Sequence, residues 1–252
     1  MNDDTYKQQS RSNTRQIEAR ETLSRLFREN PLPEDQLLIN LGLFMRSSAL
    51  ARIFFLNEIY EKIVDLPGCV MEFGTWWGQS LILFENFRAI HEPYNFSRRV
   101  IGFDTFSGYA AVGENDIPSE TIKPGGYATT TDYVKYLAEL IDYHESENVM
   151  SHIKKHRLVS GDVNETAPKF FRDNPETIVA LAFFDMALYE PTKNCLEAIK
   201  PHLIKGSVLA FDELNTPEYP GETLAVMETI GLSGHQLRRS RFTPDRCYMI
   251  IE

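Results

Sequence analysis

Apolar residues follow two different patterns along the chain. Across residues 15–29 and 49–66 they lie three or four positions apart, which is typical of helices with one buried face. From residue 69 onward, short apolar runs alternate with longer amphipathic segments. Such alternation is typical of a parallel sheet covered by helices on both faces. The pattern therefore predicts an α/β fold with a doubly wound, mostly parallel, seven-stranded sheet, preceded by extra N-terminal helices.

The predicted strands are short, and the run IVALAFF at residues 178–184 contains no polar residue. Such a run is expected of a strand in the middle of a parallel sheet. The last two strands are expected to pair as an antiparallel hairpin. Strands are predicted at residues 69–73, 100–103, 156–160, 178–184, 207–211, 236–239 and 248–251, and helices between them at residues 79–90, 132–145, 168–172, 192–199 and 222–230.

The chain divides into an N-terminal helical extension, residues 1–66, and a main domain, residues 67–252. Within the main domain, residues 105–131 are rich in Gly, Pro and Ser and show no periodicity. A segment this long without regular structure is usually functional, so we expect a lid. The extension has three possible positions: over the site, in a dimer interface, or against a face of the sheet. A homo-oligomer is one expectation from the second of these.

Composition narrows the class of partner. The chain has 252 residues, with 26 Lys and Arg against 36 Asp and Glu, a formal net charge of −10. Phosphate backbones require a positive surface, so nucleic acid is not the expected partner. No run of 18 apolar residues occurs, which predicts no membrane span. The three cysteines are widely spaced and fit no disulfide or zinc pattern, which favours the reducing cytoplasm.

Glycines and carboxylates follow the predicted strands, where a doubly wound fold binds its ligand. Glu72 to Ser80 reads EFGTWWGQS, a glycine turn leading into a helix. Its Gly-x-x-x-Gly spacing is not the Gly-x-Gly-x-x-Gly of nicotinamide-binding proteins. Asp104 ends the second strand, where a carboxylate suits the two hydroxyls of a ribose. Gly161 and Asp162 follow the third strand, and Asp162 either contacts an adenine or caps the next helix.

Three carboxylates follow two adjacent strands. Asp185 ends one strand, and Asp212 and Glu213 end the next. Adjacent parallel strands lie about 5 Å apart, so the three side chains should converge. Crowded carboxylates raise one another's pKa unless a cation neutralises them, and oxygen ligands favour Mg²⁺ or another hard divalent cation. The alternative is that Asp212 or Glu213 bonds locally and no metal is held.

In this order and spacing, these segments resemble class I S-adenosylmethionine-dependent methyltransferases, and more narrowly the macrocin O-methyltransferase-like family. The resemblance covers roughly residues 50–251 and rests on EFGTWWGQS, VIGFDTFSGY, HRLVSGDVNETAP, FDMALYEPT and GSVLAFDELNTPEYPGE. It implies metal-assisted O-methylation of a small polar sugar or natural-product acceptor, with Asp185 and Tyr189 as catalytic residues. It also implies a metal on Asp185, Asp212 and Glu213, and S-adenosylmethionine on Glu72, Gly74, Thr75, Gly78, Ser80, Asp104, Thr105, Phe106, Gly161, Asp162 and Asp185.

The chain departs from the family at two positions. The family's Asp-x-Asp-x-Tyr, whose second Asp is a candidate base, is here Asp185 to Tyr189 with Ala187 at the centre. The usual Asp-Asp is here Asp212-Glu213. A sugar hydroxyl must lose its proton, so either the metal alone activates it or the acceptor is a carboxylate, phosphate or amine. A further alternative is a binding or scaffold homologue without activity.

Overall fold

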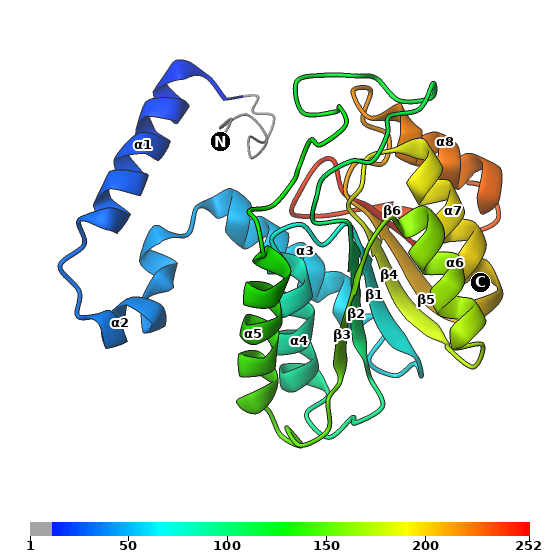
Figure 1. The fold of residues 1–252 in the computed structure, drawn as a ribbon, viewed down its shortest axis with the longest axis horizontal. Helices are drawn as coiled ribbons and strands as arrows, with labels where there is room; N and C mark the ends of the chain where they lie inside the picture. The colour runs from blue at the N-terminus through cyan, green and yellow to red at the C-terminus, as the bar shows by residue number, and fades with distance from the viewer. Residues whose placement is uncertain (1–11) are drawn as a thin grey trace.

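A seven-stranded mixed sheet forms the centre of the protein in this computed structural model, which describes residues 12–252 (Figure 1). The strand order is β3-β2-β1-β4-β5-β7-β6, and β7 alone runs opposite to the other six strands. The order reverses between β1 and β4, which makes their carboxyl ends the expected ligand site. The strands are β1 (Cys69–Phe73), β2 (Val100–Asp104), β3 (His156–Ser160), β4 (Val179–Phe184), β5 (Leu203–Phe211), β6 (Gln236–Arg239) and β7 (Cys247–Ile250).

Helices cover both faces of the sheet (Figure 1). On one face, α3 (Ser47–Glu61), α4 (Gln79–His91) and α5 (Tyr133–Ser146) bury an apolar cluster against the strands. On the other, α6 (Val163–Asp173), α7 (Tyr189–Ile199) and α8 (Pro220–Thr229) bury a second one. The predicted α/β fold and its terminal antiparallel hairpin are confirmed.

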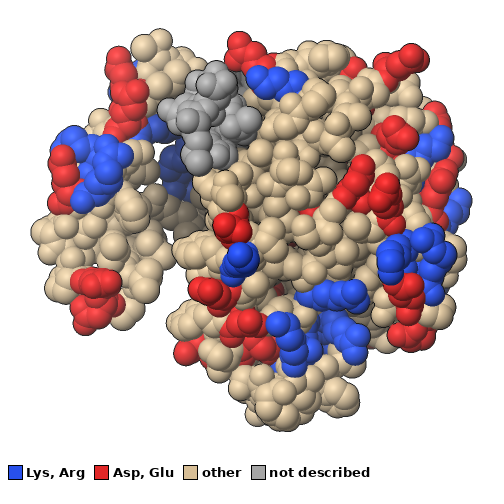
Figure 2. All heavy atoms as spheres, viewed as in Figure 1, with Lys and Arg blue, Asp and Glu red and all other residues tan. Residues whose placement is uncertain are grey.

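The remaining N-terminal helices stand apart from the sheet (Figure 1). They are α1 (Thr14–Arg28), α2 (Glu34–Ile39) and the 3-10 helix η2 (Leu41–Phe44), and none has a buried residue. We call residues 14–45 the N-terminal arm. The arm carries charges of both signs, and Figure 2 shows acidic and basic side chains interspersed over this face of the molecule. None of the described helices is long and apolar enough to cross a membrane.

Several elements differ from the sequence-based prediction, among them α2, β5 and η3. Helix α2 was not predicted, and it begins directly after Pro33 with Glu34 and Asp35 in its first turn. Acidic residues there stabilise the start of a helix. Strand β5 begins at Leu203, four residues earlier than residue 207, because Gly206 adopts a φ of +94° and allows an irregular register with β4. A short 3-10 helix, η3 (Lys200–His202), precedes it.

A row of phenylalanines sets the level of the strand ends. Phe73 of β1 lies in register with Phe103 of β2 and Phe184 of β4, and Phe184 with Phe211 of β5. Neighbouring rings stack with centroids 4.9, 5.1 and 5.1 Å apart. The residue after each phenylalanine therefore lies at the same edge of the sheet, and this is where the predicted glycine and carboxylates begin.

Candidate active site

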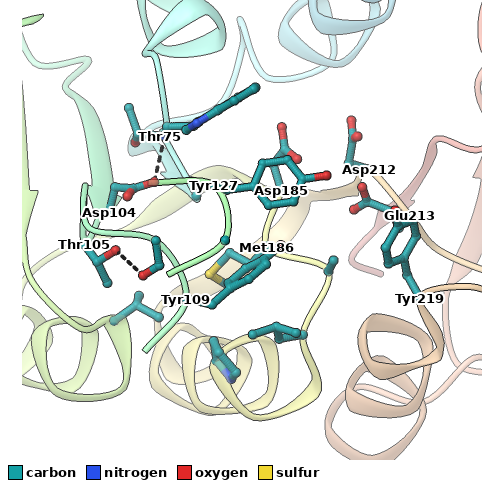
Figure 3. A pocket seen from close by; sticks show the side chains of 18 of the residues that line it. Thr75, Asp104, Thr105, Tyr109, Tyr127, Asp185, Met186, Asp212, Glu213 and Tyr219 are labelled. Carbon is teal, nitrogen blue, oxygen red and sulfur yellow. Dashed lines mark hydrogen bonds between the residues drawn. The ribbon is translucent and has the colours of Figure 1, made fainter. Parts of the chain in front are cut away.

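A cavity of about 1000 Å³ lies at the carboxyl ends of β1, β2, β4 and β5. The glycine turn and Asp104 border one end of it, the three carboxylates border the other, and residues 108–113 of the lid segment line it as well (Figure 3). Most of the residues predicted from the sequence line this one cavity: Glu72, Gly74, Thr75, Ser80, Asp104, Thr105, Asp162, Asp185, Asp212 and Glu213.

Asp104 is held in place by backbone donors. The N–H of Trp76 donates to its Oδ2 at 2.7 Å, and the N–H of Phe106 donates to its Oδ1 at 2.6 Å. Burial raises the pKa of Asp104, while these hydrogen bonds oppose the rise. Each carboxylate oxygen keeps a second acceptor position, so the side chain can still bond two hydroxyls of a ligand.

Both glycines of the turn have a positive φ that disfavours other residues, and Gly74 is also packed against backbone atoms. Gly74 has a φ of +92°, and a Cβ there would lie 2.1 Å from the carbonyl oxygen of Asp185. Gly78, at the N-terminus of α4, has a φ of +79°, and a Cβ there would lie 2.3 Å from the Cδ1 of Leu137. Between them, Trp76 adopts a φ of +46°, which points its N–H at Asp104. The turn therefore joins β4, α5 and the end of β2 around the cavity.

Asp162 caps a helix. Its Oδ1 accepts from the N–H of Asn164 at 2.9 Å, at the N-terminus of α6. Asp162 also lines the cavity, so its role as a cap leaves the predicted adenine contact open. Gly161 does not line the cavity; its N–H donates to the carbonyl of Asp104 and ties β3 to β2.

Asp185, Asp212 and Glu213 converge as predicted. One oxygen from each lies within 4.8 Å of the others, and Figure 3 shows them grouped on the opposite side of the cavity from Asp104. The Oε2 of Glu213 is buried and has no hydrogen-bond partner among the described residues. Behind it, Glu222 accepts from the Glu213 N–H at 3.1 Å, and its own Oε2 is also buried without a partner.

Two arginines, which the sequence analysis did not predict, enter this group of carboxylates. Arg52 of α3 contacts Asp185 Oδ2 at 2.6 Å and Asp212 Oδ1 at 3.0 Å. Arg246, just before β7, contacts Asp212 Oδ1 at 2.5 Å and Oδ2 at 3.0 Å. A signal for Arg52 was present, because its charge interrupts the apolar run ALARIFFL.

The charges in this group do not balance. The carboxylates of Asp185, Asp212, Glu213 and Glu222 carry four negative charges when ionised, and Arg52 and Arg246 supply two positive ones. Burial and the nearby Asp212 raise the pKa of Glu213 and of Glu222 well above the ordinary value. Without a cation, these raised pKa values favour the protonated forms of Glu213 and Glu222. Full ionisation would leave an excess of two negative charges, which one divalent cation at the unpaired Glu213 Oε2 would neutralise.

Aromatic residues of the lid segment, residues 105–131, line the cavity. Tyr109 and Tyr127 pack edge to face with centroids 5.6 Å apart, and Tyr127 packs in the same way on Trp76 at 5.4 Å. Backbone hydrogen bonds between Tyr109 and the Gly125-Gly126 pair close the neck of the lid. Burial and the nearby Glu213 raise the pKa of Tyr109 well above its ordinary value, so its hydroxyl stays a donor. These residues escaped the sequence analysis because the lid has no periodicity.

A buried aspartate fixes the lid to α7. The Oδ1 of Asp116 accepts from the Tyr189 N–H at 2.8 Å, and its Oδ2 accepts from the Gly113 N–H at 3.1 Å. Helix α7 has no side-chain cap of its own at Leu188, so the lid supplies one. Because α7 also borders the cavity through Glu190 and Pro191, the lid and the cavity wall are held together.

Some predicted site residues lie outside the cavity. The hydroxyl of Tyr189 bonds Glu228 at 2.6 Å and Lys193 at 2.9 Å, on the surface between α7 and α8. It is therefore not brought to the carboxylates, and we assign it no catalytic role. Gly78 and Phe106 do not line the cavity either; the Phe106 ring is buried in the apolar core, and only its N–H serves the site.

Comparisons with known proteins point to one family. A family model described as a methyltransferase domain matches residues 71–214. A crystal structure of CalS11, a calicheamicin methyltransferase, is 39% identical, with a TM-score of 0.92 over 96% of this chain and 94% of that one. An apo structure of CalS11, described as a TDP-rhamnose 3′-O-methyltransferase, is 37% identical, with a TM-score of 0.84 over 96% of both chains.

A more distant structure shares the fold. The O-methyltransferase NovP is 19% identical, with a TM-score of 0.61 over 80% of this chain and 79% of that one. A comparison with curated protein sequences finds no match.

Proposed function

Because this chain belongs to the class I S-adenosylmethionine-dependent methyltransferases of the macrocin O-methyltransferase-like type, we propose that it methylates a sugar hydroxyl of a nucleotide-linked sugar. One observation carries the proposal. The relative CalS11, similar over 96% of this chain, is described as acting on TDP-rhamnose. In this chain, a cavity of about 1000 Å³ joins Asp104 to the acidic group, which is ample for two ligands.

We assign the cofactor to the Asp104 end of the cavity. Asp104 would accept hydrogen bonds from both ribose hydroxyls, since each of its oxygens has one acceptor position left. Glu72, Gly74, Thr75 and Ser80 border the neighbouring part, where the methionine portion would lie, and Asp162 and Thr105 border the adenine portion. The Nε1 of Trp76, buried without a partner among the described residues, is a further donor on this wall.

We assign a divalent cation, Mg²⁺ or a similar ion, to Asp185, Asp212 and Glu213. Their converging oxygens and the unpaired Glu213 Oε2 support this site. When bound, such a cation supplies Lewis acidity that lowers the pKa of a coordinated hydroxyl. With the pKa of the hydroxyl lowered, a weaker base suffices to remove its proton. The site could therefore work with Ala187 at the position where the family carries a candidate base.

The chain's own groups would orient the acceptor and exclude water. The lid, fixed by Asp116, covers the carboxylates with Tyr109 and Tyr127, whose hydroxyls can donate to sugar oxygens. In the reaction the sulfur–methyl bond of S-adenosylmethionine breaks and a carbon–oxygen bond forms. The products are a methyl ether, S-adenosylhomocysteine and one proton, which passes to solvent.

The test is a transfer assay with S-adenosylmethionine and TDP-rhamnose, with Mg²⁺ or with EDTA, read by mass spectrometry. We expect a product heavier by one methylene group in Mg²⁺ and none in EDTA. Equal turnover in EDTA would reject the metal assignment while leaving methyl transfer intact. Cofactor binding without transfer to any nucleotide sugar would reject the proposed acceptor, and carboxylate, phosphate and amine acceptors would then be tried.

We also infer that a second copy of the chain covers the N-terminal arm. Leu38, Ile39 and Leu43 of the arm are 73%, 77% and 66% exposed. Short helices are marginal in water without a packing partner, and two-fold dimers are the commonest oligomers. Light scattering after size exclusion should show a dimer or larger assembly, and a monomer after Ile39→Glu with Leu43→Glu. A monomeric wild type would contradict the inference.

A further inference from the structure

The side chain of Arg52 is fixed inside the acidic group. Besides Asp185 and Asp212, its Nη2 donates to the Ser80 Oγ at 2.8 Å, and its guanidinium lies 5.6 Å from the ring centroid of Phe183. The side chain is only 19% exposed. These partners come from β4, β5 and α4, so the guanidinium is held by three elements of the main domain.

Arg52 bridges two of the proposed metal ligands. It bonds Asp185 through Nη2 and Asp212 through Nη1, so one cation joins two separate carboxylates. Arg246 pairs with Asp212 but has no ion pair with Asp185 in the part of the chain that the structure describes. Among those residues, Arg52 is therefore the cation that touches both strand ends.

We propose that Arg52 is the resident counter-ion of the acidic group, and that its positive charge sets how tightly Asp185, Asp212 and Glu213 hold a divalent cation. The proposal rests on the metal site assigned under the proposed function. Helix α3, in the N-terminal extension, thereby gains a role in the site. The Arg52 charge offsets the repulsion between the carboxylates and limits their affinity for a divalent cation. A unit charge about 5 Å from a divalent ion changes affinity at least roughly tenfold even at the dielectric constant of water.

The test measures Mn²⁺ binding directly, without turnover. Electron paramagnetic resonance of free Mn²⁺ gives the Kd for wild type, Arg52→Met, Arg52→Lys and the control Arg28→Met, an exposed arginine of α1. Removing the charge in Arg52→Met should tighten Mn²⁺ binding at least tenfold. Arg52→Lys loses the two-nitrogen bridge but keeps the positive charge, so its Kd should stay within about threefold of wild type if charge sets the affinity. Arg28→Met should not change the Kd.

Each outcome decides the proposal. A Kd for Arg52→Met within twofold of wild type, or a weaker one, would overturn it. If Arg52→Met binds Mn²⁺ and wild type does not, the Arg52 charge excludes the ion, which supports the proposal. If neither protein binds Mn²⁺, the proposal is wrong. Circular dichroism checks folding, and Arg52→Gln, which keeps a hydrogen-bond donor, replaces Arg52→Met if that variant does not fold. Methyl transfer by wild type, measured separately, tests the proposed function on its own.

Discussion

Replacing Asp104 with alanine should separate cofactor binding from the stability of the site. The substitution removes the acceptor of two backbone N–H groups, from Trp76 and Phe106, and the two acceptor positions left for a ribose. Nothing else in the cavity needs to move, because alanine is smaller than aspartate. Two separate measurable losses follow, one in affinity and one in folding free energy.

The magnitudes come from the hydrogen bonds. A hydrogen bond to a charged group contributes about 1.5–3 kcal/mol, so losing two from the ribose should weaken binding by at least about 3 kcal/mol. This is roughly a 150-fold increase in Kd. Leaving two backbone donors without their acceptor should lower the free energy of unfolding by about 2 kcal/mol, the low end of the range, since water can enter the cavity.

Calorimetry with S-adenosylhomocysteine measures the first loss, and urea unfolding measures the second. Glu114→Ala is the control, because Glu114 is an exposed acid of the adjacent lid segment and does not line the cavity. It should leave both quantities unchanged. Binding by Asp104→Ala within threefold of wild type would refute the assignment of this carboxylate to the ribose.

Two further substitutions test the scaffold. Gly74→Ala forces a Cβ to within 2.1 Å of the Asp185 carbonyl at a φ of +92°, so the thermal midpoint should fall by several degrees; an unchanged midpoint would contradict the packing described. Burial raises the pKa of Glu85 to about 7 in the folded state, so stability from this group is present below about pH 4.5 and is lost as pH rises through 7. Glu85→Gln does not titrate, and its amide oxygen can still accept from Arg88, so this loss of about 3 kcal/mol should disappear. The free energies of unfolding in urea at pH 5 and pH 8 should therefore differ less than in wild type. The exposed Glu139→Gln should behave like wild type.

The sheet and its row of carboxylates could be predicted because they depend on local sequence. Each central strand is a short apolar run, and parallel strands end at one edge, so Asp104, Asp185, Asp212 and Glu213 had to lie along it. The prediction needed no knowledge of side-chain packing. The sequence-based prediction located both ends of the cavity for this reason: both are marked by residues that directly follow strands.

The partners of those carboxylates could not be predicted in the same way. Arg52 meets Asp185 across 133 positions of sequence, and Asp116 meets the Tyr189 N–H across 73. No periodicity links residues this far apart. Tyr189 shows the converse: its place in a family motif suggested chemistry, but the start of α7 turns its hydroxyl toward Glu228.

The stacked phenylalanines before the strand ends fix the spacing of the residues along this edge of the sheet. Phe103, Phe73, Phe184 and Phe211 occupy four adjacent strands, each about 4.8 Å from the next, and a residue that lines the cavity follows each one. The spacing between Asp104 and the acidic group is thus fixed by hydrogen-bonded backbone rather than by loops. The lid segment can therefore change in length and sequence while the separation of Asp104 and the acidic group stays constant.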